Sequence, residues 1–401
     1  MKKKNITFIG LNYAPEDTAI GLYSTQWVDY LNDNGFNVTV ITAFPYYPQW
    51  KISEDYANKS TFYREERNGI KILRYKQYVP KSPSFLKRII HLLDFTIGSF
   101  INLFKVKKCD VVIAVVPFTT SIFLGYIQKL RFKAPLWTHI QDFEFDAALQ
   151  TGVGKKKNIF FSILFRIEKW VLSKSDMAST ISQSMLQRLS EKTKSKQFYL
   201  PNWIDEEQIN PETSDQHEYL TSDKMKILYS GNIGDKQDWE AFISFCHEID
   251  VEKYEVIIVG NGAKKDWVVE QLTALPHVSY YEPVAYEALS SLLCSADIHV
   301  LFQKPDVVDT VMPSKVLGMM ASAKPSIIIG NENSEVKTIF EDSQGGLYFT
   351  KYSSELIHEL DAISRDTSRM KTMGNNARAY VIQNYSKEQT LSKMLNALKE
   401  L

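Results

Sequence analysis

The sequence predicts an α/β protein of two domains, each a doubly wound parallel sheet. Its 401 residues, of which 44% are hydrophobic, are enough for two or three cores. Short runs rich in Val and Ile alternate with segments of helical periodicity along the whole chain. A polar stretch without periodicity, 203–223, separates two such series and reads as a linker. We therefore expect two sheets facing a cleft, with ligands at the carboxyl ends of the strands.

The expected strands are short and β-branched, as in parallel sheets covered on both faces, and the segments between them have the 3.6-residue period of helices. In the first domain the strands are 6–11, 38–42, 111–116, 136–141 and 177–181, with helices at 22–33, 120–130 and 159–173. In the second domain the strands are 226–230, 255–260, 278–281, 298–302 and 326–330, each followed by a helical segment.

The charges are divided unevenly along the chain, although the net charge is zero. Residues 1–205 hold 29 basic and 17 acidic side chains, and residues 206–401 hold 18 and 30. A basic half is expected to meet an anionic partner such as phosphate or a membrane surface. The three cysteines have no CxxC spacing, which favours a reducing, cytoplasmic compartment. The longest apolar stretch, 89–104, is shorter than the roughly 20 residues that cross a bilayer, so we expect no transmembrane helix.

Two glycine turns follow neighbouring strands of the second domain. Ser230, Gly231 and Asn232 open the first turn, Lys236 closes it, and Asn261 and Gly262 lie in the second. Glycines expose backbone N–H donors, and a lysine two residues beyond Gly234 can reach a diphosphate. The pattern predicts a phosphate or nucleotide site.

Two further helix starts are candidate anion sites. Gly21 stands where the first helix begins, although a single glycine there is often only a turn. Lys315 follows Ser314 at the start of a helix, where its charge opposes the helix dipole. This suggests an anion that is held by the lysine and by the positive end of the helix together. The alternative is an ordinary capped helix with an exposed lysine.

The acidic segment 142–146 is the strongest candidate for a metal site, and it is a weak one. A calcium loop begun at Asp142 would need Gly and Glu where Ala147 and Val153 stand. We interpret Asp142 as an acid, a base or a hydroxyl-binding group at the sheet edge. His139 is either catalytic or a satisfied core histidine, and the remaining histidines lack ligand spacing, so no metal is expected.

Basic residues are interleaved with apolar ones at 81–108 and 129–133. This composition suits the interface of an anionic membrane. We favour a membrane over nucleic acid, because no recognition motif accompanies the charge and the second half is acidic. The alternative is a core helix with solvated charges.

Several motifs resemble those of family 4 glycosyltransferases, especially the bacterial capsule, colanic-acid and O-antigen branch that includes N-acetylfucosamine transferases. The motifs occur in family order at 12–16 with Gly21, 35–42, 44–48, 141–142, 200–205, 229–237 and 312–315. The resemblance implies the GT-B fold, with an acceptor domain at 1–203, a nucleotide-sugar domain at 204–380 and a C-terminal helix, 381–401, that packs back on the first. It also implies retention of anomeric configuration, with no metal or other cofactor.

The resemblance also implies roles for individual residues. Gly21 would lie near the donor phosphates, Lys236 would neutralise the diphosphate, and Asp142 would lie on the acceptor side. The remaining donor-site residues implied are Ser230, Gly231, Asn232, Asn261, Gly262, Ser314, Lys315, Val316 and Leu317.

The sequence also departs from the family pattern. Asn232 stands where many relatives have Arg, and Thr310 and Gly318 stand where many have a pair of glutamates. Asp309 is the candidate replacement for the first acid. A histidine of many relatives matches either His139 or Gln141.

The resulting expectation is a retaining glycosyltransferase on the inner face of a bacterial cytoplasmic membrane. It would move a sugar, such as N-acetylfucosamine or a related 6-deoxyhexose, from a UDP-sugar to a saccharide on a polyprenyl diphosphate. The alternatives are a sugar-nucleotide 2-epimerase of the same fold and a catalytically silent nucleotide-binding scaffold in polysaccharide assembly.

Overall fold

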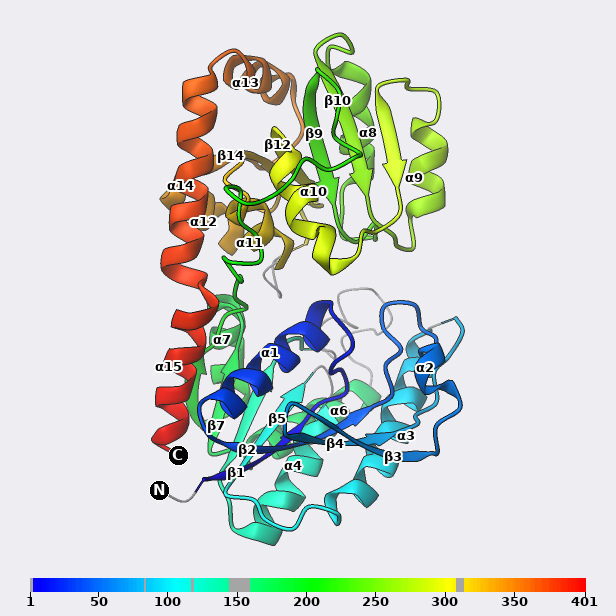
Figure 1. Ribbon diagram of the computed structural model, residues 1–401, viewed down its shortest axis with the longest axis vertical. Coiled ribbons are helices and arrows are strands. Elements are labelled where there is room, and N and C mark those ends of the chain that lie inside the picture. The colour runs from blue at the N-terminus through cyan, green and yellow to red at the C-terminus, as the bar shows by residue number, and fades with distance from the viewer. Residues whose placement is uncertain (1–2, 83, 117–118, 144–158, 308–313) are drawn as a thin grey trace. The chain divides into compact units, whose positions relative to one another are not determined.

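The computed structural model describes residues 3–82, 84–116, 119–143, 159–307 and 314–401 (Figure 1). The chain forms two compact units, one of Met1–Pro201 with Leu391–Leu401 and one of Asn202–Thr390. Each unit is built on one sheet whose strands are joined through helices. The predicted class, two α/β domains with parallel sheets, is confirmed.

The first unit has the strand order β3-β4-β2-β1-β5-β6-β7-β8. Its strands are β1 (Asn5–Ile9), β2 (Asn37–Ala43), β3 (Phe62–Arg67), β4 (Ile70–Tyr75), β5 (Val111–Val116), β6 (Leu136–Ile140), β7 (Met177–Thr180) and β8 (Lys196–Tyr199). Its helices are α1 (Ala19–Asp33), α2 (Glu54–Ala57), α3 (Phe85–Leu103), α4 (Thr119–Phe132), α6 (Ile159–Leu172) and α7 (Gln183–Lys192).

The β3–β4 hairpin at the sheet edge is absent from the sequence expectation. Its strands pair antiparallel around Asn68 and Gly69, which have φ of 51° and 80°. Such left-handed pairs form the tight hairpin turns for which Asn-Gly is the usual sequence. The dipeptide was therefore a usable signal, but the charged run 62–67 lacks the apolar character that marks an inner strand.

Helices cover both faces of the first sheet. The connection through α1 leads from β1 toward the β2 edge of the sheet, whereas the connections through α3, α4 and α6 lead toward β7. Because such connections between parallel strands are right-handed, α1 lies on one face of the sheet and the other three helices lie on the opposite face. Figure 1 shows α1 and α4 on opposite sides of the strands. The C-terminal helix α15 (Lys387–Lys399) reaches α1, where the Trp27 indole donates to Met394 Sδ over 3.1 Å.

The second unit is a parallel sheet with the order β11-β10-β9-β12-β13-β14. Its strands are β9 (Met225–Ser230), β10 (Tyr254–Val259), β11 (Val278–Tyr281), β12 (Ile298–Phe302), β13 (Ser326–Ile329) and β14 (Gly346–Phe349). Its helices are α8 (Trp239–Glu248), α9 (Lys265–Leu272), η1 (Tyr286–Ala288), α10 (Leu289–Ser295), α11 (Ser314–Ala321), α12 (Glu335–Ser343), α13 (Ser354–Ser364) and α14 (Thr367–Tyr385).

The strand order of the second unit reverses between β9 and β12, because successive strands run outward from β9 on one side and from β12 on the other. Doubly wound sheets bind ligands outside the carboxyl ends of the strands at such a reversal. Both predicted glycine turns lie at this end, since they follow the paired strands β9 and β10. Across the described ranges, no helix is long and apolar enough to cross a membrane.

Candidate functional site

The two glycine turns of the second unit pack directly against each other. The N–H of Ile233 in the first turn donates to the carbonyl of Asn261 in the second over 2.9 Å. A Cβ on Gly260 would lie 1.9 Å from the Gly231 carbonyl oxygen, and a Cβ on Gly262 would lie 2.3 Å from that of Ile233. These glycines are therefore required by the contact between the turns, in addition to any room that they leave for a ligand.

Lys315 lies beside the first turn. Gly231 has a φ of 134°, and a Cβ there would meet the Lys315 side chain, 3.3 Å from Cδ and 3.5 Å from Nζ. Lys315 Nζ donates to the Tyr229 hydroxyl over 3.0 Å and lies 4.6 Å from the centre of its ring. The Tyr229 hydroxyl in turn donates to the Asn232 carbonyl over 2.7 Å. The ammonium group is thus held at the carboxyl end of β9.

The charge of Lys315 lacks a protein counter-ion in the part of the chain that the structure describes, where none of its contacts is to a carboxylate. Burial lowers the pKa of Lys315 to about 7. The residue is the second of α11, so the unpaired N–H groups of the helix start add positive potential near it. An anion at this place would stabilise the charged lysine and the helix start together.

Lys236 lies at the far end of the first turn and is exposed. Its backbone is fixed, because its carbonyl accepts the N–H of Lys304 over 3.1 Å. Within the turn, the N–H of Gly234 donates to Gln237 Oε1 over 3.1 Å, and its carbonyl accepts the Trp239 indole N–H over 2.9 Å. The main chain that carries Lys236 is therefore anchored while the ammonium group stays in solvent.

The remaining donor-site residues of the second unit also lie at this edge or next to it. Asn261 is exposed, and its side chain accepts the N–H of Gly262 over 2.7 Å and donates to Glu282 over 3.1 Å. Ser230 is the last residue of β9, and Ser314 is the first of α11. Val316 and Leu317 follow with side chains buried in the core of the unit. The structure thus brings together one set of predicted residues around the carboxyl ends of β9 and β10.

The candidate catalytic acid Asp309 lies outside the described residues, as does Thr310. Gly318, which stands where many family members have the second glutamate, belongs to α11. A Cβ there would lie 3.2 Å from Leu293 and 3.6 Å from Ile209. These aliphatic contacts are unfavourable for a carboxylate at this position.

Gly21, near the start of α1 in the first unit, is in close contact with Glu16. A Cβ at Gly21 would lie 2.7 Å from that of Glu16. The Glu16 carboxylate accepts the N–H groups of Tyr46 over 2.8 Å and Tyr47 over 2.9 Å, and the amide of Asn12 over 2.8 Å. Burial raises the pKa of this carboxyl above its usual range. This packing by itself requires glycine, and the role of Gly21 at the donor phosphates stays a prediction.

His139 lies in β6 with a side chain that is 1% exposed. Its Nδ1 is 2.9 Å from Ser179 Oγ and its Nε2 is 2.9 Å from Gln141 Nε2, while Trp27 packs against the ring at a centroid distance of 5.2 Å. Burial lowers its pKa to about 3, so the ring is neutral. Of the two interpretations of His139, these contacts favour the satisfied core histidine.

Asp142 follows β6 at the carboxyl edge of the same sheet. It borders a small pocket together with Thr119 and Glu168. Glu168 forms an ion pair of 2.5 Å with Lys192, and both side chains are almost fully buried. This buried pair beside Asp142 was missed at the level of the sequence, although a glutamate inside the apolar helix 159–172 was a signal for it.

The structure offers no alternative metal site within the described ranges, where no group of three His, Cys, Asp or Glu side chains gathers. Tyr229 is a third residue to which the sequence analysis assigned no role, although it belongs to the motif 229–237. It directly precedes the first glycine turn, and only the fold shows that its hydroxyl joins that turn to Lys315.

Comparison with known proteins identifies relatives of both units. A glycosyl transferase 4-like domain matches residues 18–203, and a domain of glycosyl transferases group 1 matches residues 211–380. The glycosyl transferase WcaI of Escherichia coli (strain K12), named for colanic acid biosynthesis, is 32% identical over 98% of this chain and 99% of its own.

Solved structures of similar fold extend over nearly the whole chain. Sucrose-phosphate synthase from Thermosynechococcus elongatus is 14% identical, covers 99% of both chains and gives a TM-score of 0.75. HepE of Anabaena, in complex with UDP-glucose, is 13% identical, covers 99% of this chain and 100% of its own, and gives a TM-score of 0.68.

Proposed function

The chain belongs to the family 4 glycosyltransferases of GT-B fold, and we propose that it transfers a sugar from a UDP-sugar to a lipid-linked saccharide with retention of configuration. The observation that carries the proposal is Lys315, a partly buried ammonium without a carboxylate partner in the described residues, placed beside two interlocked glycine turns. A diphosphate is the anion that best matches this arrangement.

The donor diphosphate would bind at the carboxyl ends of β9 and β10. Lys315 would contact it from the strand end and Lys236 from solvent. When the bond between the sugar C1 and the phosphate oxygen breaks, negative charge accumulates on the leaving diphosphate, and fixed positive groups stabilise that charge. The reaction needs no metal in this proposal. HepE, of similar fold, binds UDP-glucose, which supports UDP as the nucleotide.

The acceptor would be a saccharide on polyprenyl diphosphate at the inner face of a bacterial cytoplasmic membrane. The likeness to WcaI supports a pathway for colanic acid or a related capsule or O-antigen polysaccharide. N-Acetylfucosamine or another 6-deoxyhexose is the proposed sugar. Asp142 is the proposed acceptor-side group, and Asp309 the proposed replacement acid.

Thermal unfolding with UDP, GDP, ADP and dTDP tests the donor site. At about a hundred times its dissociation constant, a nucleotide that binds one site adds about 2.7 kcal/mol to stability. We expect UDP to stabilise the protein selectively, and the Lys236→Ala and Lys315→Met variants to lose most of this effect. Stabilisation of both variants equal to that of the wild type would reject the proposed site.

Transfer is then measured with UDP-sugars and a polyprenyl diphosphate saccharide. Lys236→Ala should lower turnover by orders of magnitude while the UDP-free protein unfolds at the wild-type temperature, and Lys351→Ala, at an exposed position of the same unit, should have no effect. Near-normal transfer by Lys236→Ala would refute its role. Asp309→Asn should also reduce turnover strongly, and full activity of that variant would exclude Asp309 as the replacement acid.

A further inference from the structure

Large apolar side chains are exposed on one helical layer of the first unit. Of the 16 such side chains in the described residues, 12 lie on α3 with its C-cap, on α4 or on α6. They are Leu86, Ile90, Leu93, Ile97, Phe100, Ile101 and Phe104 around α3, Phe123 and Leu130 on α4, and Ile163, Ile167 and Trp170 on α6. Helix α4 packs against both α3 and α6, so the three helices form one layer.

The exposed residues of α3 form a continuous stripe. They recur every three or four positions from Leu86 to Phe104, which places them on one side of the helix. Leu92, Phe95 and Leu103 are buried on the other side. Ile97 is 69% exposed and Leu86 is 67% exposed, so this outer side has no partner within the described residues. Apolar surface of this extent marks an interaction site on a soluble protein.

The charges on the three helices are almost all positive. Their sequences contain six Lys or Arg residues and two acids, Asp94 and Glu168. Asp94 accepts the Tyr75 hydroxyl over 3.0 Å and the N–H of Tyr78 over 2.6 Å. Glu168 is buried against Lys192. Both acids are therefore engaged by the protein. Of the six basic residues, Lys129 forms an ion pair of 2.7 Å with Asp176, so the outer side of the layer presents the positive charge of the other five.

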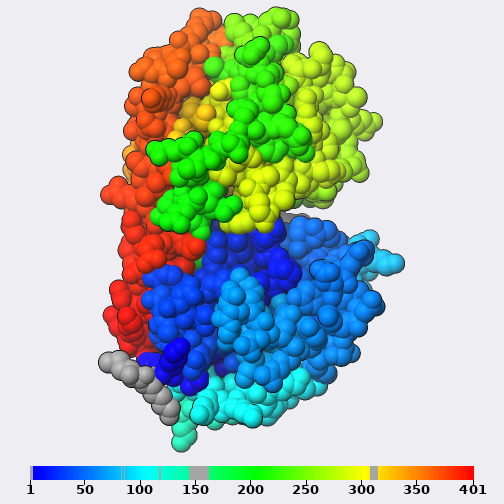
Figure 2. All heavy atoms as spheres, in the orientation of Figure 1, coloured from blue at the N-terminus to red at the C-terminus, as the bar shows by residue number. Residues whose placement is uncertain are grey.

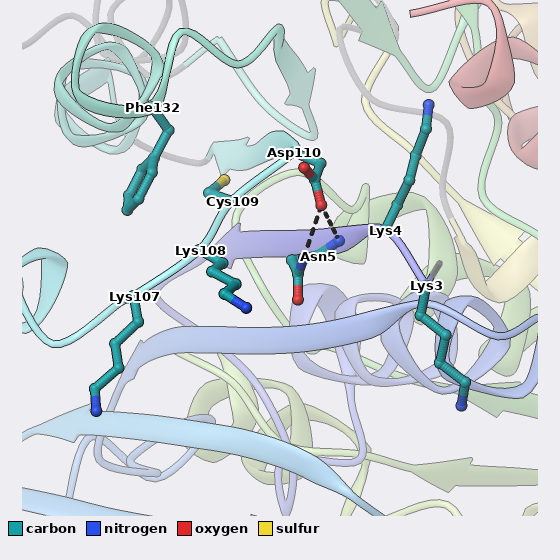
Figure 3. A pocket seen from close by; sticks show the side chains of 8 residues that line it. All are labelled: Lys3, Lys4, Asn5, Lys107, Lys108, Cys109, Asp110 and Phe132. Carbon is teal, nitrogen blue, oxygen red and sulfur yellow. Dashed lines mark hydrogen bonds between the residues drawn. The ribbon is translucent and has the colours of Figure 1, made fainter. Parts of the chain in front are cut away.

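A lysine pocket lies at the end of this layer, between the start of β1 and the start of β5 (Figure 3). Lys3, Lys4, Lys107 and Lys108 line it, all of them exposed and none paired with a described carboxylate. Its one acid, Asp110, accepts the backbone N–H and the side-chain amide of Asn5 over 2.7 and 2.8 Å. Figure 3 shows Lys3, Lys107 and Lys108 extending to the same side of the strands.

Arg131 joins the lysine pocket to the apolar stripe. Its guanidinium donates to the Leu103 carbonyl over 2.6 Å at the end of α3. The same group lies 5.3 Å from the ring centre of Phe104, the last residue of the stripe, and 4.7 Å from that of Phe132, which lines the pocket. In Figure 2 the residues of this region, in cyan, form part of the molecular surface at the lower edge of the view.

We propose that the outer side of α3, α4 and α6 docks on an anionic lipid bilayer, and that the lysine pocket takes an acidic phospholipid headgroup. Aliphatic side chains would enter the acyl boundary while the lysines contact headgroup phosphates, a division of roles typical of interfacial helices. A second copy of the chain fits less well, because two positive faces repel each other. This inference rests on the proposed function, in which the acceptor is at a membrane. Vesicle binding can still be measured without sugar transfer, so the two can be tested separately.

Flotation of the full chain with vesicles tests the surface. We expect binding to phosphatidylcholine vesicles that contain phosphatidylglycerol, little binding to phosphatidylcholine alone, and weaker binding as salt is raised. Lys107→Ser with Lys108→Ser should weaken partitioning about 30-fold, because each lysine near an anionic surface contributes about 1 kcal/mol. Leu93→Ser with Ile97→Ser should weaken it by more than roughly tenfold through lost apolar burial.

Matched controls come from exposed positions of the second unit. Lys351→Ser with Lys371→Ser, and Trp267→Ser, should bind vesicles like the wild type. Stabilisation by UDP should be unchanged in all variants, which separates failure of the membrane surface from failure of the donor site. The proposal is overturned if phosphatidylglycerol does not change vesicle binding, or if the stripe and lysine variants float with vesicles like the wild type. It is also overturned if sedimentation shows that the wild type is a dimer and that the stripe variant is a monomer.

Discussion

Replacement of Lys315 by Met should remove a pH dependence from UDP binding. In the free protein burial lowers the pKa of this lysine to about 7 from an ordinary 10.5, so it is neutral over much of the range above pH 7. A bound diphosphate restores the charged form, which means that binding takes up a proton above pH 7. The last phosphate ionisation, near pH 6, is complete in this range and adds no slope.

The size of the effect follows from this proton uptake. Affinity should approach a tenfold fall per pH unit well above pH 7, which gives a fall of about 50-fold between pH 7 and pH 9. Isothermal titration of UDP at several pH values, in two buffers of different ionisation enthalpy, measures both the affinity and the proton uptake. Lys315→Met should bind UDP weakly with a flat profile, whereas Lys351→Met should keep the wild-type slope. Equal slopes in the wild type and Lys315→Met would refute this account of the lysine.

The same lysine should affect the stability of the UDP-free protein. Because its folded pKa is depressed, the unfolded chain binds one more proton than the folded chain above pH 7, so stability rises with pH there. Urea unfolding should show the wild type gaining about 2 kcal/mol relative to Lys315→Met between pH 7 and pH 9. A constant difference between the two proteins would contradict the depressed pKa.

Three other predictions concern the free energy of unfolding. Gly260→Ala should cost about 1–3 kcal/mol in urea unfolding, because its Cβ would strike a carbonyl oxygen of the neighbouring turn, whereas Gly10→Ala has only ordinary contacts and should change little. Lys192→Met should lower the free energy of unfolding by about 3–5 kcal/mol, because it leaves Glu168 charged and buried without a partner. The double variant Lys192→Met with Glu168→Leu should recover most of that loss. Equal losses in the single and the double variant would argue against the ion pair. Glu16→Ala should lower the free energy of unfolding by roughly 2–5 kcal/mol, since two backbone N–H groups lose their acceptor, and a wild-type value would contradict the network.

The alternation of apolar runs and helical periods was sufficient to predict the two sheets, because buried parallel strands have a strong local pattern. It was insufficient for β3, β4, β8 and β14, although the edge strand β11 was predicted. Residues 62–67 are mostly charged, and 346–349 contain no β-branched residue, so pairing with a neighbour is what makes strands of them. The turn at Asn68 and Gly69 was the local signal that could have revealed the hairpin.

The candidate site was predicted in part for a similar reason. Glycines and lysines after strands indicate a phosphate site from local sequence, and their convergence follows from the strand order. The contact of Lys315 with Tyr229 joins residues 86 positions apart, and the contact between Gly260 and Gly231 depends on how two turns pack. Distances of this kind are set by tertiary structure, which no pattern within a single segment encodes.

The helix α15 affects the order in which the protein folds during synthesis. Trp27 is 1% exposed and contacts Met394, but the segment that supplies Met394 is translated only after the whole of the second unit. At 5–20 residues per second the ribosome needs roughly 10–40 s to pass from Pro201 to Leu391. During that interval the nascent first unit has an uncovered aromatic site on α1. The unit whose synthesis begins first is therefore completed last, because residues 391–401 are translated only after the whole of the second unit.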